Sequence, residues 1–194
     1  MKFKIFKFNS VTSTNDVAIN LIKKEKKKIG CVYANTQTKG RGSHGKKWVS
    51  NKGNLFVSIF FPLKDKFPSF NEFSIINPVI ISGVINYFCD KKIISFKWPN
   101  DVFVNKKKIC GILQEVIVSN SKRFLIIGIG LNISSSPNIK AKYKTTNIFK
   151  ETQNKPNSKK LINLLIESYE KFFLNLDSYN FENFKKKTDL MAFK

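Results

Sequence analysis

The chain has 194 residues, a formal net charge of +22 and 42% hydrophobic residues. Its length suits one domain with a sizeable core. The charge alone would indicate nucleic-acid binding, but only Arg41 and Arg123 carry the guanidinium that suits phosphate and base recognition best. The lysines are scattered and accompany many Asn, Ile and Phe residues. This pattern favours a general drift in amino-acid usage over a nucleic-acid-binding surface.

Neither a membrane span nor an export signal is predicted. No segment approaches the roughly 20 apolar residues that cross a bilayer, and the first residues, MKFKIFKFNS, lack a continuous apolar region. Cys31, Cys89 and Cys110 are far apart without CxxC spacing, so we expect reduced, buried thiols in a cytoplasmic protein. His44 is the only histidine, and no metal cluster is visible in the sequence.

The N-terminal part predicts a strand followed by a helix. Residues 3–8 have a strand-like pattern, and residues 13–15, Ser-Thr-Asn, precede apolar side chains at helical spacing. The three polar residues indicate a helix N-cap or the polar wall of a ligand site at a helix start. The charged stretch 23–28 would end the helix, with Gly30 as its C-cap.

The middle of the chain predicts two strands and a long helix. Strands are expected at residues 31–36 and 55–61, and Pro62 would close the second one. Residues 68–90 are expected to form a helix with a broad apolar face. Pro78 indicates that this helix begins or kinks there.

The remaining pattern completes an α+β fold. Short strands are expected at residues 94–98, 102–104, 109–118 and 124–133, and turns at 105–107 and 119–121 are typical of antiparallel hairpins. Residues 134–155 are expected to form a polar surface loop. Asn157 and Ser158 would cap a final amphipathic helix, and a lysine run at 185–187 precedes the C-terminus. This order predicts a mixed, largely antiparallel sheet packed with helices.

Residues 40–48, GRGSHGKKW, combine three glycines with basic side chains. Glycine lets the backbone approach a ligand closely, and Arg41 can hold a phosphate or carboxylate through two N–H groups. The stretch matches neither a P-loop nor a dinucleotide-binding fingerprint. Taken alone, it would indicate a flexible surface hairpin.

A second motif, KWPND at residues 97–101, groups a cation, an aromatic ring, a proline and two polar side chains. Asn100 can recognise an adenine-like edge, and Asp101 can bind Mg²⁺ or orient an amine. Taken alone, the motif is also typical of a turn between strands. Gly111 lacks a side chain and would permit a ligand to approach a strand closely. Residues 128–132, GIGLN, end another strand, and their glycines would likewise permit a ligand to approach that strand closely.

In this order and at roughly these spacings, GRGSHGKKW, KWPND, KKICGILQE and GIGLN resemble the catalytic domain of biotin–protein ligases, that is, biotin–[acetyl-CoA carboxylase] ligases. Residues 13–15 and Gln37 fit the same pattern, and the resemblance runs from about Phe8 to the C-terminal helix. It implies the class II aminoacyl-tRNA synthetase-like fold shared with lipoate ligases. We expect one catalytic domain over residues 1–194, without an N-terminal helix-turn-helix and with the small C-terminal β-domain of many relatives absent or truncated.

The resemblance also implies a set of site residues. Those facing biotin would be Ser13, Thr14, Asn15, Gln37, Gly40, Arg41, Gly42, Ser43, Lys108, Gly111 and Leu113. Those facing ATP would be Arg41, Lys46, Trp48, Lys97, Asn100, Asp101, Lys108 and Asn132. Arg41, Lys108 and Asp101 would be catalytic. Asp101 would also be a weak ligand of Mg²⁺, which would be held largely through phosphates.

The implied reaction brings two anions together. Biotin's carboxylate would attack the α-phosphate of ATP, while Arg41, Lys108 and Mg²⁺ offset the repulsion. Pyrophosphate would leave, and a lysine of a biotin carboxyl carrier domain would attack the biotinyl-5′-AMP. Asp101 would act as base or orienter for that lysine. We expect no specific nucleic-acid or membrane partner, and either a monomer or a homodimer.

The loop departs from the family pattern at Ser43, where many relatives have arginine. Lys46 or Lys47 would replace the missing guanidinium only as point charges, so we expect biotinyl-AMP to escape faster than in relatives with both arginines. Three alternatives stay open at this point. They are a lipoate or octanoate ligase or transferase of the same superfamily, a basic nucleic-acid-binding module, and an inactive relative that only binds biotin.

Overall fold

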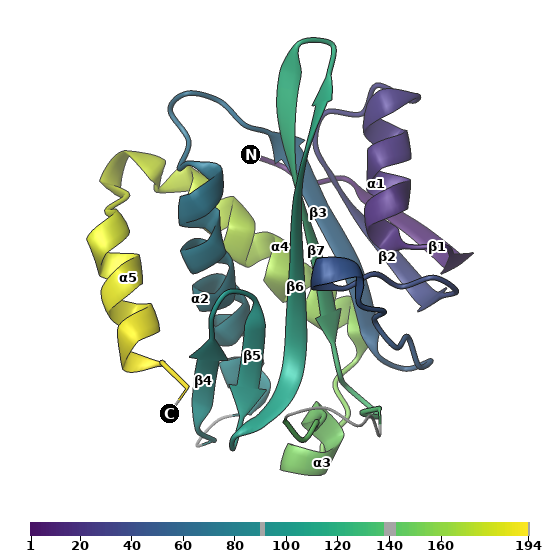
Figure 1. Cartoon of the computed structure of the whole chain (residues 1–194), viewed down its shortest axis with the longest axis vertical. Coiled ribbons are helices and arrows are strands. Elements are labelled where there is room, and N and C mark those ends of the chain that lie inside the picture. The colour runs from purple at the N-terminus through teal and green to yellow at the C-terminus, as the bar shows by residue number, and fades with distance from the viewer. Residues whose placement is uncertain (90–91, 138–142, 194) are drawn as a thin grey trace.

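Figure 1 shows a computed structural model of the chain, which describes residues 1–89, 92–137 and 143–193. Within these residues, seven strands form one sheet in the order β1-β2-β3-β7-β6-β5-β4. The strands are β1 (Ile5–Val11), β2 (Gly30–Gln37), β3 (Leu55–Pro62), β4 (Ile94–Lys97), β5 (Asp101–Val104), β6 (Lys107–Ser119) and β7 (Lys122–Leu131). The β1–β2 pair is parallel and the other neighbouring pairs are antiparallel. The predicted mixed, largely antiparallel α+β fold is therefore confirmed.

Helices cover both faces of this sheet (Figure 1). The helix α1 (Thr14–Lys23) contacts β2, β3 and β7 on one face. On the other side lie α2 (Phe70–Phe88), which contacts β4, β5 and β6, and α4 (Ser158–Leu174) and α5 (Phe181–Leu190), which both contact α2. The short helix α3 (Ile148–Thr152) lies near the end of β7. The sheet is thus packed between α1 on one side and α2 and α4 on the other.

Burial on two sides explains the apolar run of β3. Val57, Ile59 and Phe61 belong to the main core, which also contains side chains of α2 and α4. Phe60 points to the other face and packs in a second cluster with Ala18 and other side chains of α1. A strand covered on both faces needs apolar residues at successive positions, so it does not alternate.

Two-residue turns connect the hairpins where the sequence predicts them. Asn105 and Lys106, between β5 and β6, have φ angles of 49° and 60°. Asn120 and Ser121, between β6 and β7, have φ angles of 49° and 58°. Positive φ at both central residues matches the twist of antiparallel strands. The two turns set where the pairing of β5, β6 and β7 begins. Within the β5–β6 pair, an irregularity between Val102 and Phe103 then shifts the register, so that Asp101 pairs with Gly111.

Several local predictions near the N-terminus are wrong or only partly right. Ser13 occupies the N-cap position of α1, but its side chain makes no capping hydrogen bond. The helix ends at Lys23 instead of continuing through residue 28, and Gly30 is the first residue of β2, not a C-cap. The helix stops early because the side chains of residues 24–26 are exposed and gain nothing from packing.

The long helix and the C-terminal region also differ from expectation. Pro78 does not begin α2, which runs continuously from Ser69, a side-chain N-cap, with Pro78 inside it. Asp90, the expected last residue, lies outside the described residues. The predicted loop 134–155, of which 138–142 lie outside the described residues, contains α3. The lysine run 185–187 belongs to α5, a helix that was not predicted.

Cys31, Cys89 and Cys110 are free and buried, as predicted. Burial raises the pKa of the Cys31 thiol to about 12, so this thiol is protonated at neutral pH. In the described part of the chain, no helix has the length and apolar character that crossing a bilayer requires.

Candidate active site

A cavity of about 380 Å³ lies where the start of α1, the Gly-rich segment 40–48, and strands β6 and β7 meet. It is lined by every predicted site residue except Gly40: Ser13, Thr14, Asn15, Gln37, Arg41, Gly42, Ser43, Lys46, Trp48, Lys97, Asn100, Asp101, Lys108, Gly111, Leu113 and Asn132. The fold therefore brings motifs from distant parts of the chain to one place. The roles given to these residues stay predictions.

The segment 40–48 forms a small hairpin, which we call the Gly-rich hairpin. Gly42 N donates to Lys46 O at 2.7 Å, and Trp48 N donates to Gly40 O at 2.9 Å. His44 adopts φ 54° at the tip. Gly40 is the first residue of the hairpin, and an added Cβ there would come within 2.5 Å of Trp48 O. Gly40 is thus needed for the close approach of backbone to backbone and does not line the cavity.

Trp48 packs on a floor of two glycines. Gly111 of β6 and Gly130 of β7 are directly paired across the sheet. A Cβ at Gly111 would come within 2.5 Å of the Trp48 ring, and a Cβ at Gly130 would overlap the same ring. The space that we expected a ligand to use above Gly111 is therefore occupied by the indole of Trp48. The glycines let the indole sit flat against the sheet.

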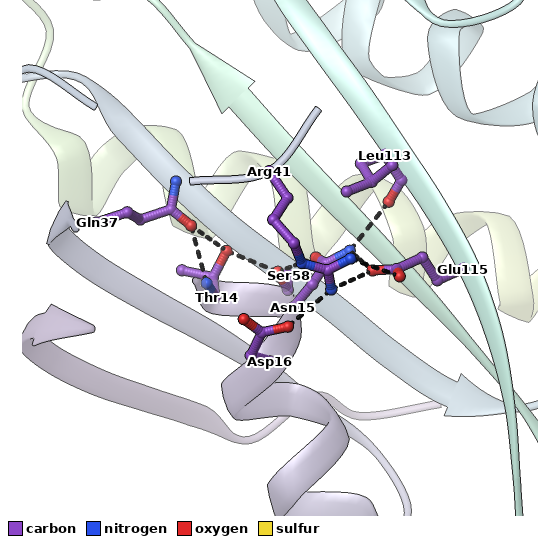
Figure 2. A network of polar contacts seen from close by, with 8 residues as sticks. All are labelled: Thr14, Asn15, Asp16, Gln37, Arg41, Ser58, Leu113 and Glu115. Atoms are coloured by element: carbon purple, nitrogen blue, oxygen red, sulfur yellow. Dashed lines mark hydrogen bonds and ion pairs between the residues drawn. The ribbon is translucent and has the colours of Figure 1, made fainter. Parts of the chain in front are cut away.

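A polar network surrounds the start of α1 (Figure 2). Thr14 N donates to Gln37 Oε1 at 2.8 Å, and the Thr14 hydroxyl lies 3.2 Å from the same oxygen. The Ser58 hydroxyl lies 2.8 Å from Thr14 Oγ1 and 2.5 Å from Asn15 Oδ1. Asn15 Nδ2 donates to Glu115 Oε2 at 2.6 Å. These side chains hold one another in fixed orientations at one end of the cavity.

Arg41 points from the Gly-rich hairpin toward α1 and β6 (Figure 2). Its two terminal nitrogens donate to the two carboxylate oxygens of Glu115, each at 2.8 Å. Asp16 Oδ1 lies 2.8 Å from Nη2 as a second ion-pair partner. The hydrogen bonds with Glu115 are the main reason that the pKa of the Arg41 guanidinium is raised. The two N–H groups expected to hold a phosphate or carboxylate are therefore directed at protein carboxylates in this structure.

Basic side chains approach the cavity from β4 and β6. Lys108 Nζ lies 2.7 Å from Asp101 Oδ1 and 5.5 Å from the centre of the Trp48 ring. Lys97 Nζ lies 3.8 Å from the centre of the Tyr143 ring. Both lysines line the cavity, so its wall carries positive charge.

Four buried polar atoms of cavity-lining residues accept or donate no hydrogen bond within the described residues: Arg41 Nε, Trp48 Nε1, Asp101 Oδ1 and Asn132 Oδ1. Of these atoms, Asp101 Oδ1 is nevertheless paired with a charge, because Lys108 Nζ lies 2.7 Å away, so the other three are the ones that lack a polar partner. Buried polar groups are almost always satisfied in folded proteins. A wall with several unsatisfied donors and acceptors therefore fits a polar ligand.

The described residues hold no group of three or more His, Cys, Asp or Glu side chains that could bind a metal ion by themselves. Asp101 offers one carboxylate, whose buried Oδ1 lies 2.7 Å from Lys108 Nζ. A single carboxylate suits a Mg²⁺ ion whose other ligands are phosphate oxygens and water. The site thus fits Mg²⁺ only together with a phosphate-bearing substrate.

Sequence reasoning missed three residues of the polar network. Ser58 is the single polar residue in the otherwise apolar strand β3, which was an available signal. Glu115 is the last residue of the KKICGILQE motif, but it was given no role. Asp16 gave no signal of its own, because an acidic residue at a helix surface is common. Tyr143 and Thr145 also line the cavity, although residues 134–155 were expected only to form a surface loop.

Residues 6–132 match the model of the Biotin/lipoate A/B protein ligase family. The chain belongs to this family. It is 30% identical over 126 residues to the bifunctional ligase/repressor BirA of Escherichia coli, which covers 64% of this chain and 39% of BirA. It is 26% identical over 156 residues to the biotin–[acetyl-CoA-carboxylase] ligase of Paracoccus denitrificans, covering 77% of this chain and 65% of that protein. The chain spans less than two thirds of these curated relatives.

Solved structures of family members match nearly the whole chain. The biotin protein ligase from Aquifex aeolicus in complex with biotin and ATP has a TM-score of 0.80 and 26% identity, over 97% of this chain and 78% of that one. The Leishmania major enzyme in complex with biotinyl-5-AMP has a TM-score of 0.83 and 27% identity, over 98% of this chain and 81% of that one. The fold is that of biotin protein ligases, as the sequence motifs predicted.

Proposed function

We propose that this protein is an ATP-dependent ligase that converts biotin to biotinyl-5′-AMP and transfers the biotinyl group to a lysine of a carrier domain. One observation carries the proposal: a single cavity is lined by the residues of all four motifs that resemble biotin–protein ligases. The similar Aquifex and Leishmania structures are complexes of biotin, ATP or biotinyl-5-AMP, which supports the same substrates here.

The polar network at the start of α1 suits the ureido ring of biotin. Gln37 and Thr14 offer amide and hydroxyl groups at fixed positions, and Ser58 supports them from beneath. A ligand with N–H donors and a carbonyl acceptor needs such preoriented partners, because unpaired polar groups are costly inside a protein. Biotin would therefore lie with its ring here and its carboxylate toward Lys108.

The adenine end would use the groups around Trp48. Asn132 Oδ1 is a buried acceptor that receives no hydrogen bond from the described residues. The Asn132 amide nitrogen donates to Thr146 O at 3.0 Å, which fixes the orientation of the amide group. The Asn100 amide donates to Ser43 Oγ at 3.2 Å and to Ile112 O at 3.1 Å, so its carbonyl oxygen can accept from a ligand. An exocyclic amine of adenine would satisfy such acceptors.

The first half-reaction needs positive charge between two anions. Biotin's carboxylate oxygen bonds to the α-phosphorus of ATP, and the bond to the departing pyrophosphate breaks. Lys108 would stabilise the charge that builds up on the phosphate oxygens in the transition state. Asp101 would hold Mg²⁺ together with the phosphates, and that ion would supply further neutralisation of charge.

In the second half-reaction, the carrier lysine amine attacks the acyl carbon of biotinyl-AMP, and AMP leaves. The amine must lose a proton as the amide bond forms. Asp101 would orient that amine or accept its proton. If the Asp101→Asn variant transferred biotin from preformed biotinyl-AMP at the normal rate, this role would be excluded.

The test is to mix the purified protein with ATP, Mg²⁺, an apo biotin carboxyl carrier domain and either biotin or lipoate. Mass spectrometry of the carrier then reports the product. A biotin-sized increase that requires ATP supports the proposal, and an increase with lipoate alone assigns the protein to lipoate attachment. Pyrophosphate release with biotin but without carrier modification would limit the activity to the first half-reaction, and no reaction at all would refute the proposal.

A further inference from the structure

The Gly-rich hairpin is attached to the rest of the protein at its two ends. Near its C-terminal end, Trp48 packs on Gly111 and Gly130. Near its N-terminal end, Arg41 reaches Glu115 and Asp16. The hydrogen bonds inside the hairpin hold its own backbone together but do not tie it to the sheet. One neutral side-chain bond reaches this half from outside, because Asn100 Nδ2 donates to Ser43 Oγ at 3.2 Å. Charge-assisted bonds are about twice as strong as neutral ones, so the ion pairs of Arg41 contribute most to how firmly this half of the hairpin lies over the cavity.

The Arg41 contacts have the geometry of a strong anchor. Both terminal nitrogens meet both oxygens of Glu115 in parallel at 2.8 Å, which is the bidentate arrangement that suits guanidinium and carboxylate. Asp16 adds a contact at 2.8 Å from another element, the first turn of α1. One side chain of the hairpin thus connects it to both a strand and a helix of the scaffold.

The same carboxylate also orients the biotin end of the cavity. Glu115 Oε2 accepts from Asn15 Nδ2 at 2.6 Å as well as from Arg41. Asn15 in turn meets the Ser58 hydroxyl through Oδ1. Figure 2 shows this continuous path from Arg41 through Glu115 and Asn15 to Ser58. Loss of the Glu115 charge would therefore loosen the hairpin and one wall of the pocket together.

We propose that Glu115 and Asp16 are positioning residues that, through Arg41, hold the Gly-rich hairpin over the cavity and retain the activated intermediate. The proposal rests on the proposed function for the identity of that intermediate, biotinyl-AMP. Arg41 then serves the hairpin, and binding of the substrate anions falls to cavity-lining cations such as Lys108. The opposing model is that Arg41 leaves its carboxylates and binds a substrate anion instead.

The first test measures the anchor without any substrate. Hydrogen exchange of the intact protein, read by mass spectrometry, reports the amides of Gly42, Lys46 and Trp48, which are hydrogen-bonded within the hairpin. Glu115→Gln keeps the shape of the side chain but removes its charge and one acceptor. We expect the amide exchange rate of the hairpin to rise about tenfold in this variant. A tenfold change lies at the lower end of the effects of hydrogen bonds to charged groups, because the Arg41–Glu115 pair is partly exposed to solvent.

Matched variants separate the anchor from a general loss of stability. Glu167→Gln makes the same change at an exposed position of α4 and should leave exchange of the hairpin as in wild type. Asp16→Asn should give a smaller rise than Glu115→Gln, because Asp16 contacts only one nitrogen. Exchange of the amides of β3 and β7 should not change in any of these variants. Arg41→Lys should restore part of the protection that Arg41→Ala loses, since an ammonium can pair with one carboxylate.

The second test follows the intermediate in a single turnover with biotin and ATP. We expect biotinyl-AMP to dissociate about tenfold faster from Glu115→Gln than from wild type, while the pyrophosphate burst changes much less. Unchanged exchange of the hairpin, or unchanged dissociation, would overturn the proposal. Faster adenylation and tighter ATP binding in Glu115→Gln would overturn it in favour of the opposing model. If wild type makes no biotinyl-AMP, the proposed function fails while the exchange result still decides the anchor.

Discussion

Replacement of Lys108 by alanine is expected to slow the formation of biotinyl-AMP by about 10²–10³, the usual cost of one charge-stabilising donor. The backbone at this position is held on both sides. Lys108 pairs with Phe103 of β5, its N–H donates to Lys144 O at 2.9 Å, and its carbonyl accepts from Thr146 N at 2.9 Å. The substitution therefore removes the ammonium without moving the strand.

The size of the effect follows from charge and burial. The Lys108 side chain is 27% exposed, so its environment lies between bulk water and a dry interior. Two unit charges 4 Å apart interact by about 4 kcal/mol at an effective dielectric constant of 20. A 10²–10³-fold slower reaction corresponds to a loss of about 2.7–4 kcal/mol of transition-state stabilisation, which lies at or below that interaction energy. The variant also leaves Asp101 without its cation, which adds repulsion toward phosphates, so we expect the upper part of the range.

The assay is the pyrophosphate burst in a single turnover with saturating biotin and ATP. Lys107→Ala is the matched control, because Lys107 is adjacent on β6, also pairs with a carboxylate (Glu151 at 3.2 Å), and does not line the cavity. A burst in Lys108→Ala as fast as in Lys107→Ala would refute the reasoning.

Three further predictions concern the walls of the cavity. Ser43→Arg should slow the escape of biotinyl-AMP during gel filtration relative to wild type, because a guanidinium can hold the phosphate in two places; equal retention would contradict this. Ser58→Ala should weaken biotin binding by about 1–3 kcal/mol, measured by calorimetry, since Thr14 and Asn15 lose a shared partner. The control is Ser82→Ala, which should bind biotin normally because the Ser82 hydroxyl has no partner among the described residues. Gly130→Ala should displace the Trp48 ring and raise the KM for ATP more than the KM for biotin; an unchanged KM for ATP would show that the ring does not contact the nucleotide.

Local sequence determined much of the framework. The strands between Leu55 and Leu131 were predicted within a few residues, because apolar runs and two-residue turns fix local conformation. The motifs around Arg41, Asn100 and Lys108 also predicted the family, since their order and spacing are rarely found together. The end of α1 was less well predicted, because the lysine run after it has helical propensity but no packing partner.

Tertiary structure decided which side chains meet. The helix α5 was missed because its sequence is mostly polar; it is held by Phe184, whose ring lies 5.8 Å from that of Phe172 and 5.7 Å from that of Tyr179. Its stability comes from packing on other elements, not from its own pattern.

The site follows the same rule. Sequence placed Arg41 in a Gly-rich loop and assigned it to a substrate anion, but it could not show that Glu115 and Asp16 lie within reach. Those contacts depend on the register of β6 and on where α1 crosses the sheet. The residue types along the chain determined the chemistry available to this protein. The packing of its helix and strands decided which charges neutralise one another, because pairing between distant residues is fixed only when the whole sheet is assembled.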